Sequence, residues 1–275
     1  MAFTIKLASY EDMKECARVE TETMGNYCYL EDAWHYFYNQ KGGLVTVYKE
    51  DEMIGIGRFT VLFDGSGWLE TLRIVPQWQK QGAGKEIYKM YKQLADEYGC
   101  PSMAMFTGVK NEVSAGLAKF NGLSKAAQHR GYHLTDLSGG CVHGFKHVSW
   151  QRSVELITPL KEEYNDYMIF NRTFYHVNEE NAKGFAVEGK VFEDKENGSF
   201  IVCGARFQHH ATLHIAMMGG DYDKCLDFAV NYAKAQGLEK VSCTFAIDNP
   251  KLEQALIARG FASEPSDLIT MDIKF

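Results

Sequence analysis

A short glycine loop between a predicted strand and a predicted helix constrains the fold of this chain more than any other feature. The loop has the sequence QKQGAGKE (residues 79–86) and follows the mainly apolar residues 68–75. After the loop, apolar side chains recur on one helical face as far as Tyr98. Glycine lets a ligand approach the backbone closely, and the unpaired N–H groups that open a helix attract an anion. The segment therefore predicts a phosphate-binding turn in an α/β protein.

Hydrophobic periodicity predicts alternating strands and helices along most of the chain. In the first part it predicts a helix that starts near residues 9–12, a helix through Tyr98, strands at residues 3–7, 44–49, 53–64, 68–75 and 102–107, and a ribbon over residues 131–150. In the second part it predicts strands at residues 200–208, 212–218 and 240–246 and a helix at residues 222–235. We therefore expect an α/β fold of the α+β type, built on a mixed sheet.

The two parts repeat the same helix–glycine–strand order. The separation between Gly99 and Gly237 equals that between Asn111 and Asn249. Any two α/β units share some of this helix–glycine–strand order, but two pairs of identical residues at the same separation favour a duplicated domain. A chain of 275 residues is long enough for two small domains. We place them at residues 1–151 and 152–275.

Composition excludes several classes of function. A net charge of −7 is unlike the basic surface of a nucleic-acid-binding protein. No run of about eighteen apolar residues predicts a membrane helix. The seven cysteines contain no CxxC pair and are typical of free thiols in a reducing compartment. We expect a cytoplasmic protein that binds neither nucleic acid nor a membrane.

The histidines do not predict a metal site. His143 and His147 lie in the predicted ribbon, where residues four apart are separated by about 13 Å. His210 and His214 have the same spacing, and no cysteine or carboxylate completes a tetrahedral set. We therefore expect no structural or catalytic metal.

Three phosphate-binding motifs can be compared with the glycine loop. A P-loop requires glycine where Gln79 stands and Ser or Thr where Glu86 stands. A dinucleotide-binding loop requires a third glycine where Ile87 stands. Both motifs therefore fail. Residues 74–84, IVPQWQKQGAG, instead resemble the signature of the GNAT superfamily of N-acetyltransferases, V-x-P-x-x-[RQ]-x-x-G-x-[GA], with isoleucine in place of the valine.

The resemblance covers roughly residues 3–150 and implies acetyl-CoA as co-substrate. It implies that the loop and the first helical turn hold the pyrophosphate, and that the preceding strand binds the pantetheine arm and polarises the thioester carbonyl. The residues so assigned are Ile74, Val75, Gln79, Lys80, Gln81, Gly82, Ala83, Gly84, Lys85 and Asn111. For Asn111, a capping role at the next helix is an equal alternative.

In the second half the resemblance extends only to architecture. The corresponding loop, MMGGDYDK (residues 217–224), lacks the spaced glycines and carries two aspartates where a pyrophosphate would lie. Negative charge at this place repels an anionic ligand. Residues 152–275 are therefore interpreted as a degenerate GNAT-like domain without coenzyme A, which supports the acceptor site or forms a homodimer.

The implied reaction is acyl transfer to an amine, which needs a base because amines are protonated near neutral pH. Glu70 is the candidate, because some family members have a glutamate base in this strand; a structural glutamate is the alternative. It is expected on the same strand face as Leu72 and Ile74. The aromatic residues 24–39, MGNYCYLEDAWHYFYN, form either core or a wall of the acceptor pocket.

A tyrosine that protonates the leaving thiolate in many family members is missing here. Two ways of counting its position reach Ala118 and Ala127, and both reach Leu256 in the second half. We therefore predict an N-acetyltransferase that transfers an acetyl group from acetyl-CoA to a small-molecule or peptide amine. The alternative is a CoA-binding regulatory protein without turnover.

Overall fold

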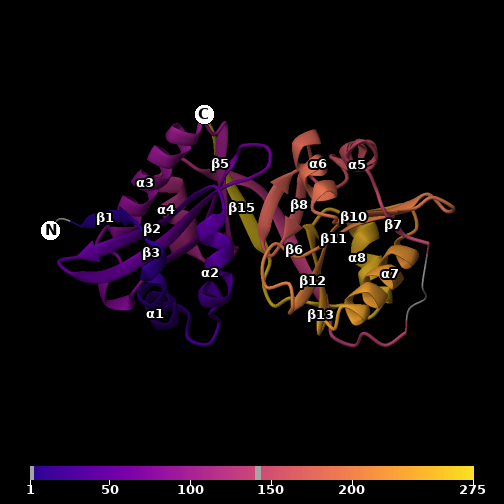
Figure 1. The fold of residues 1–275 in the computed structure, drawn as a ribbon, viewed down its shortest axis with the longest axis horizontal. Coiled ribbons are helices and arrows are strands. Elements are labelled where there is room, and N and C mark those ends of the chain that lie inside the picture. Colours follow the sequence, from indigo (N-terminus) through magenta and orange to yellow (C-terminus); the bar gives the residue numbers. More distant parts are fainter. Residues whose placement is uncertain (1–2, 140–143) are drawn as a thin grey trace. The chain divides into compact units, whose positions relative to one another are not determined.

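The computed structural model describes residues 3–139 and 144–275 (Figure 1). The chain divides into two compact units. Unit 1 comprises Met1–Thr107, Asn111–Ala126 and Met271–Phe275, and unit 2 comprises Gly108–Lys110 and Ala127–Thr270. These units differ from a division into residues 1–151 and 152–275. Residues 127–151 belong to unit 2, and the last five residues belong to unit 1.

Unit 1 is an antiparallel meander followed by a parallel strand, with helices on both faces. Its elements are β1 (Thr4–Leu7), α1 (Met13–Met24), α2 (Leu30–Asn39), β2 (Gly42–Lys49), β3 (Glu52–Val61), β4 (Gly67–Ile74), α3 (Ala83–Tyr98), β5 (Ser102–Gly108) and α4 (Glu112–Phe120). Strands β1 to β4 pair antiparallel in sequence order, and β5 pairs parallel with β4. Helix α3 lies on one side of these strands and α1 and α2 on the other (Figure 1).

Tight packing fixes α3 on the sheet. Ile87, Tyr91 and Leu94 of α3 are buried. A Cβ atom added to Gly57 of β3 would lie only 2.1 Å from the Tyr91 hydroxyl oxygen, so the absence of a side chain there allows the close approach. Gly99 ends the helix in the left-handed conformation with a φ of 64°.

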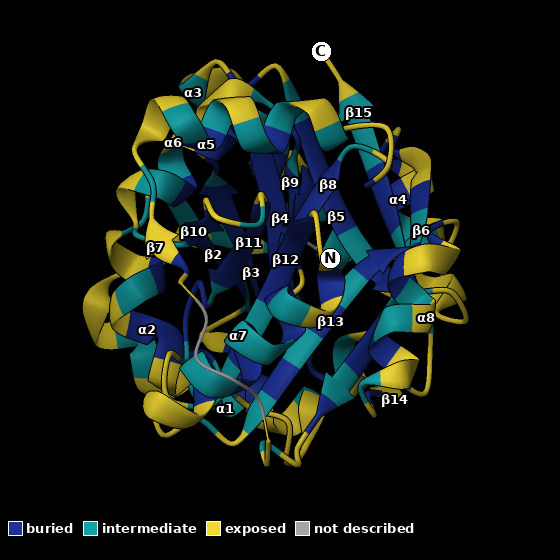
Figure 2. Cartoon of the chain, turned by 90° about the vertical axis from the view of Figure 1, so that its right-hand side faces the viewer, coloured by how far each residue is buried: buried dark blue, intermediate teal, exposed yellow. Residues whose placement is uncertain are grey.

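Unit 2 repeats the bulk of this arrangement and adds a separate two-stranded antiparallel sheet, β8 and β9. Its elements are β6 (Ser124–Leu134), β7 (Lys146–His147), α5 (Trp150–Ile157), β8 (Tyr167–Phe170), β9 (Thr173–His176), α6 (Glu179–Val187), β10 (Val191–Asp194), β11 (Ser199–Gly204), β12 (Thr212–Gly219), α7 (Tyr222–Ala235), β13 (Lys240–Ala246), α8 (Pro250–Ala258), β14 (Ala262–Ser263) and β15 (Leu268–Lys274). The first three residues of β6 and the last four of β15 belong to unit 1. Strands β12 and β13 are parallel, as β4 and β5 are, and the other pairs along β6-β13-β12-β11-β10-β7 are antiparallel. Figure 2 shows β10, β11 and β12 largely buried, whereas the two residues of β7 are exposed.

The anchors of the sequence repeat have the same structural roles in both units. Gly99 and Gly237 follow α3 and α7 with φ values of 64° and 68°. Asn111 and Asn249 are the N-caps of α4 and α8, and their side-chain oxygens accept hydrogen bonds from the Ser114 and Leu252 amides, both at 3.1 Å. The mixed α/β fold predicted from the sequence is confirmed.

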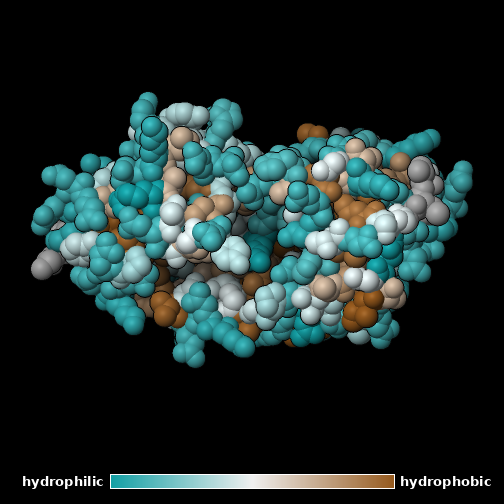
Figure 3. Space-filling model, turned by 90° about the horizontal axis from the view of Figure 1, so that it is seen from below, coloured by the Kyte–Doolittle hydropathy of each residue, from teal (hydrophilic) through white to brown (hydrophobic). Residues whose placement is uncertain are grey.

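The ribbon predicted over residues 131–150 is wrong in extent. Strand β6 begins earlier, at Ser124, and ends at Leu134, while β7 has only two residues. His143 and Cys141 lie outside the described residues; the other six cysteines are free thiols. Within residues 3–139 and 144–275, every helix is too short or too polar to cross a bilayer. On the face in Figure 3, hydrophobic residues form small groups among hydrophilic ones.

Candidate functional site

The predicted phosphate loop connects β4 to α3 and leaves a row of backbone amides without backbone acceptors. Gly82 is the N-cap of α3 with a φ of 101°, and Lys80 also has a positive φ, 59°. Within the described chain, the amides of residues 80–84 donate to no backbone carbonyl. The turn conformation and the first helical turn therefore present several N–H donors together, as an anion-binding helix N-terminus does.

Both glycines of the loop have a physical reason. At Gly82 nothing lies within 4 Å of an added Cβ, so the positive φ is what favours glycine there. At Gly84 an added Cβ would lie 2.9 Å from Leu117 Cδ2, and glycine lets α4 pack against the start of α3. Lys85 Nζ lies 3.8 Å from the centre of the exposed Phe120 ring on α4. The loop, the two glycines and this cation fit a large anionic cofactor.

Strand β4 has an open edge just before the loop. It pairs with β5 only from Gly67 to Leu69, and the rest of the strand has no partner on that side in the described pairing. The Val75 amide donates to the Ile54 carbonyl on β3 at 2.9 Å, so the peptide groups of Ile74 face the open edge. The Ile74 carbonyl accepts from the Gln79 side-chain amide at 2.9 Å. Of the two strand residues assigned to pantetheine, Ile74 presents its backbone and Val75 is turned to β3.

A β-bulge interrupts β4 beside this edge. Ile56 pairs with Arg73, and Arg58 pairs with Glu70. Thr71 and Leu72 of β4 therefore both oppose one residue of β3, Gly57. Thr71 has a φ of 59°, which is unusual for a β-branched residue and costs about 1–3 kcal/mol. Such strain at a strand edge marks a candidate functional position.

The bulge changes the direction of Glu70. Glu70 was expected on the face of Leu72 and Ile74, and that expectation is wrong. Gly55 and Gly57 of β3 lie on the face that α3 covers, and Ile74 pairs with Gly55, so Ile74 is on that face too. Glu70 instead pairs with Arg58, the residue after Gly57, which points to the opposite face. Glu70 is 9% exposed and accepts a hydrogen bond from the Thr60 hydroxyl at 2.7 Å. The extra residue of the bulge inverts the strand's alternation, so Glu70 lies on the face of α1 and α2.

The aromatic segment of residues 24–39 is divided between core and site. Trp34 and Phe37 are buried in the core of unit 1. Tyr29, just before α2, places its hydroxyl 3.3 Å from the Thr71 side-chain oxygen at the bulge. Burial raises the pKa of Tyr29, and the positive charge of Arg73 opposes that rise. The structure thus adds Thr71 and Arg73, which the sequence pattern did not indicate, to the surroundings of Glu70.

The remaining sequence-based candidates have structural roles. Asn111 caps α4, which is the alternative considered for it. Ala118, Ala127 and Leu256, the positions reached in the search for a tyrosine, are all buried. Among the residues that the structure describes, no cluster of three or more His, Cys, Asp or Glu could hold a metal ion.

In unit 2 the equivalent strand edge and helix start are filled by the protein itself. Strand β12 is also bulged, where it pairs with β11 near Cys203. The Tyr164 hydroxyl donates to the Met218 carbonyl and accepts from the Met218 amide, both at 2.8 Å. The Asp221 side chain caps α7 by accepting from the Lys224 amide at 3.2 Å. A Cβ on Gly220 would lie 2.8 Å from the Gly198 carbonyl oxygen, so the turn before β11 packs directly against this loop.

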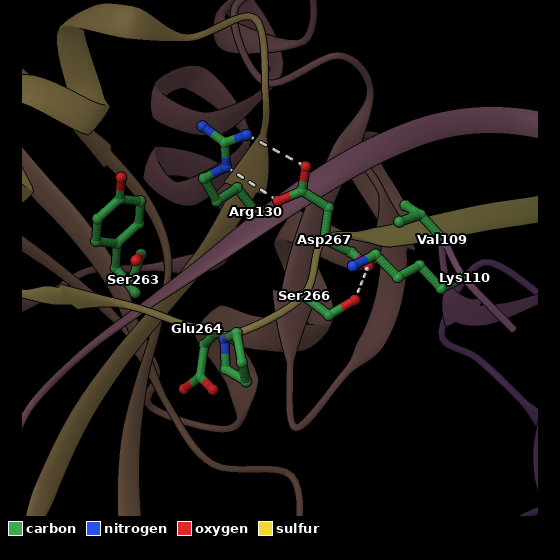
Figure 4. Close-up of a pocket in the computed structure, with 9 residues that line it drawn as sticks. Val109, Lys110, Arg130, Ser263, Glu264, Ser266 and Asp267 are labelled. Atoms are coloured by element: carbon green, nitrogen blue, oxygen red, sulfur yellow. Dashed lines mark hydrogen bonds and ion pairs between the residues drawn. The ribbon is translucent and has the colours of Figure 1, made fainter.

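Unit 2 also contains a surface pocket of about 350 Å³ (Figure 4). Arg130 and Asp267 face each other in it, with Arg130 Nε 2.9 Å from Asp267 Oδ1. Arg130 also forms an ion pair with Glu253 at 3.0 Å. The hydrogen bond from Arg130 lowers the pKa of Asp267. These opposite charges neutralise one another, so the ion pairs explain the charged lining of the pocket without a ligand. The pocket also lies apart in sequence from the predicted phosphate loop.

The fold and the loop define the class of protein: two related α/β units, of which the first has a bulged, open-edged strand that leads into an amide-rich turn. Residues 8–123 match the family model described as Acetyltransferase (GNAT) family. The resemblance predicted from the sequence is therefore confirmed for this part of the chain. The family acts by transfer of an acetyl group from acetyl-CoA. No curated protein matches the sequence.

Solved structures extend the likeness to the whole chain. A GCN5-related N-acetyltransferase from Sphaerobacter thermophilus is 9% identical, with a TM-score of 0.70 over 99% of this chain and 95% of that one. A tandem GNAT protein from the clavulanic acid biosynthesis pathway is 12% identical, with a TM-score of 0.63 over 99% of this chain and 98% of that one. A GCN5-related N-acetyltransferase from Kribbella flavida is 11% identical, with a TM-score of 0.55 over 98% of this chain and 70% of that one. At these identities the likeness shows the fold, including its tandem form.

Proposed function

We propose that unit 1 binds acetyl-CoA at the loop of residues 79–85 and transfers the acetyl group to an amine. The observation that carries the proposal is the continuity of two features: the bulged, open edge of β4 and the row of unpaired amides that follows it. The amides suit the pyrophosphate, and the positive charges of Lys80 and Lys85 suit the phosphates. The Ile74 peptide group at the open edge suits the amide-containing pantetheine arm.

The reaction needs only two chemical roles from the chain. The neutral amine nitrogen attacks the thioester carbonyl carbon, the C–S bond breaks, and coenzyme A leaves as a thiolate. Glu70 takes the proton that the amine gives up, directly or through one water, and a backbone N–H at the bulge stabilises the developing oxyanion. Water supplies the proton to the thiolate. Positioning of the two substrates provides much of the acceleration.

Unit 2 is proposed to hold no coenzyme A. Tyr164 already makes both hydrogen bonds of the Met218 backbone, which is the counterpart of the open edge of β4. Asp221 places a carboxylate at the start of α7, where a pyrophosphate would need positive potential. One molecule of acetyl-CoA per chain is therefore expected.

Two measurements test this function. Isothermal titration should give a single acetyl-CoA site per chain, and thermal stability should rise with acetyl-CoA and stay unchanged with ATP. Stabilisation by ATP alone would overturn the proposal. A panel of amines, assayed by release of coenzyme A, should identify turnover, and Glu70→Gln should lower kcat by about 10²–10⁴-fold. The Thr60 hydroxyl can still donate to a glutamine oxygen, so this variant is expected to fold.

The second candidate is a CoA-binding regulatory protein without turnover. It is favoured by the buried, apolar residues Ala118, Ala127 and Leu256 at the positions where a tyrosine acid was sought. This alternative predicts one acetyl-CoA per chain, no release of coenzyme A with any amine, and no effect of Glu70→Gln on acetyl-CoA affinity.

A further inference from the structure

The bulge in β4 places an arginine on the same face as the proposed base. Arg73 pairs with Ile56, and Glu70 pairs with Arg58. Ile56 and Arg58 are two residues apart on a regular part of β3 and therefore point to the same face. In a regular strand, residues 70 and 73 would point to opposite faces. The additional residue in β4 brings the two side chains together on the face of α1 and α2.

Arg73 has no carboxylate partner in the part of the chain that the structure describes. Its Nη1 donates to the carbonyl of the neighbouring Leu72 at 3.1 Å. Its Nε is buried and has no hydrogen-bond partner among the described residues. By contrast, Arg18, Arg130 and Arg152 each form ion pairs with carboxylates. A guanidinium keeps its charge, so a half-buried one without an anion is costly unless a ligand supplies that anion.

The position of Arg73 indicates which ligand that is. The phosphate loop opens α3, and α3 covers the opposite face of β3 and β4. Arg73 is two residues from Thr71 in β4, and the Thr71 side-chain oxygen lies 3.3 Å from the Tyr29 hydroxyl. The positive charge of Arg73 also opposes the rise in the pKa of Tyr29. Two donors, the guanidinium and a phenol, thus lie beside Glu70 on the face away from the phosphate loop.

We propose that the amine acceptor carries a carboxylate, as a free amino acid does, and that Arg73 binds this carboxylate while the amino group faces Glu70. A planar guanidinium binds a carboxylate through two parallel N–H···O bonds, which fixes the orientation of the amine as well as its identity. Arg73 is then the residue that determines acceptor specificity. This inference rests on the proposed acetyl transfer.

The experiment compares each of the twenty amino acids with its α-carboxamide, by release of coenzyme A at a fixed, saturating acetyl-CoA concentration. At least one free amino acid should be acetylated with a kcat/KM at least tenfold above that of its amide. Arg73→Gln should lower kcat/KM for that acid at least tenfold, leave the amide unchanged, and leave the KM for acetyl-CoA unchanged. Arg73→Lys, which keeps the charge without the planar fork, should retain part of the preference.

Arg18→Gln is the matched control, because it removes a paired arginine from α1 in the same unit. It should leave the preference for the acid intact. Equal rates with acids and amides, turnover confined to polyamines, or a raised KM for acetyl-CoA in Arg73→Gln would each overturn the inference while leaving acetyl transfer in place. Failure to bind acetyl-CoA at all would instead overturn the proposed function. Circular dichroism spectra of the variants show whether they are folded.

Discussion

Replacement of Tyr164 by phenylalanine tests the claim that unit 2 fills its own strand edge. Tyr164 is 2% exposed, and its hydroxyl both donates to and accepts from the backbone of Met218 at 2.8 Å. Phenylalanine keeps the ring and its packing but leaves the Met218 amide and carbonyl buried without these partners. At about 1–2 kcal/mol for each hydrogen bond lost, the free energy of unfolding of unit 2 should fall by about 2–4 kcal/mol.

The most direct assay is amide hydrogen exchange, followed by mass spectrometry on a peptide that contains Met218. A loss of about 3 kcal/mol corresponds to exchange about 100-fold faster, since about 1.4 kcal/mol is a factor of ten. Urea unfolding should show a lower midpoint with an unchanged slope. Tyr232→Phe is the control, because no hydrogen bond of its hydroxyl is found among the described residues; it should change stability by less than about 0.5 kcal/mol.

A loss below about 1 kcal/mol, or an unchanged exchange rate at Met218, would refute the reasoning. Either result would mean that the edge of β12 satisfies its hydrogen bonds without Tyr164. The argument that unit 2 has no place for a pantetheine arm would then lose its main support, and a second acetyl-CoA site would have to be sought there by titration.

Three further predictions concern the loop, the pH dependence and the packing. Gly82→Ala should weaken acetyl-CoA binding by about tenfold or more in titration, because the strained φ displaces donor amides, whereas Gly237→Ala carries similar strain and should leave binding unchanged. Burial lowers the pKa of His129 to about 3, below an unfolded value near 6.5. Below pH 6.5 the unfolded state therefore binds a proton that the folded state does not. The contribution of His129 to the free energy of unfolding is fully present above pH 6.5 and falls at lower pH by at most about 1.4 kcal/mol per pH unit. Urea titrations should show this slope reduced in His129→Gln, and an unchanged slope would contradict it. Gly116→Ala, on the exposed side of α4, should stabilise by about 0.5–1 kcal/mol, while Gly57→Ala should destabilise by about 1–3 kcal/mol through its clash with Tyr91, both read from thermal unfolding.

Local features of the sequence were sufficient for the loop and for the repeat. The two glycines of the loop and the helix that follows it are specified by residues within a short segment, so pattern and chemistry together predict them. Gly99 and Asn111 are helix-end signals of the same local kind, and the structure gives them the same roles as their counterparts in unit 2. The class of the fold follows from these elements and their order.

The direction of Glu70 was not predictable in this way. A threonine with positive φ carries no sequence signal, and a period of two assigns Glu70 and Ile74 to one face. Only the pairing of β4 with β3 shows the extra residue that separates them. The same register brings Arg73 to the face of Glu70, which no spacing rule for a regular strand allows.

The filled edge of unit 2 shows the same division. The aspartates of residues 217–224 indicate from the sequence that this loop disfavours an anion, because charge at a helix start acts locally. Tyr164 is more than fifty residues from Met218 in the chain, and its hydroxyl reaches that backbone only in the folded unit. Turns, helix starts and charge are properties of neighbours in sequence. Strand register, the direction of a side chain at a bulge and the partner of a buried polar group depend on residues that only folding brings together.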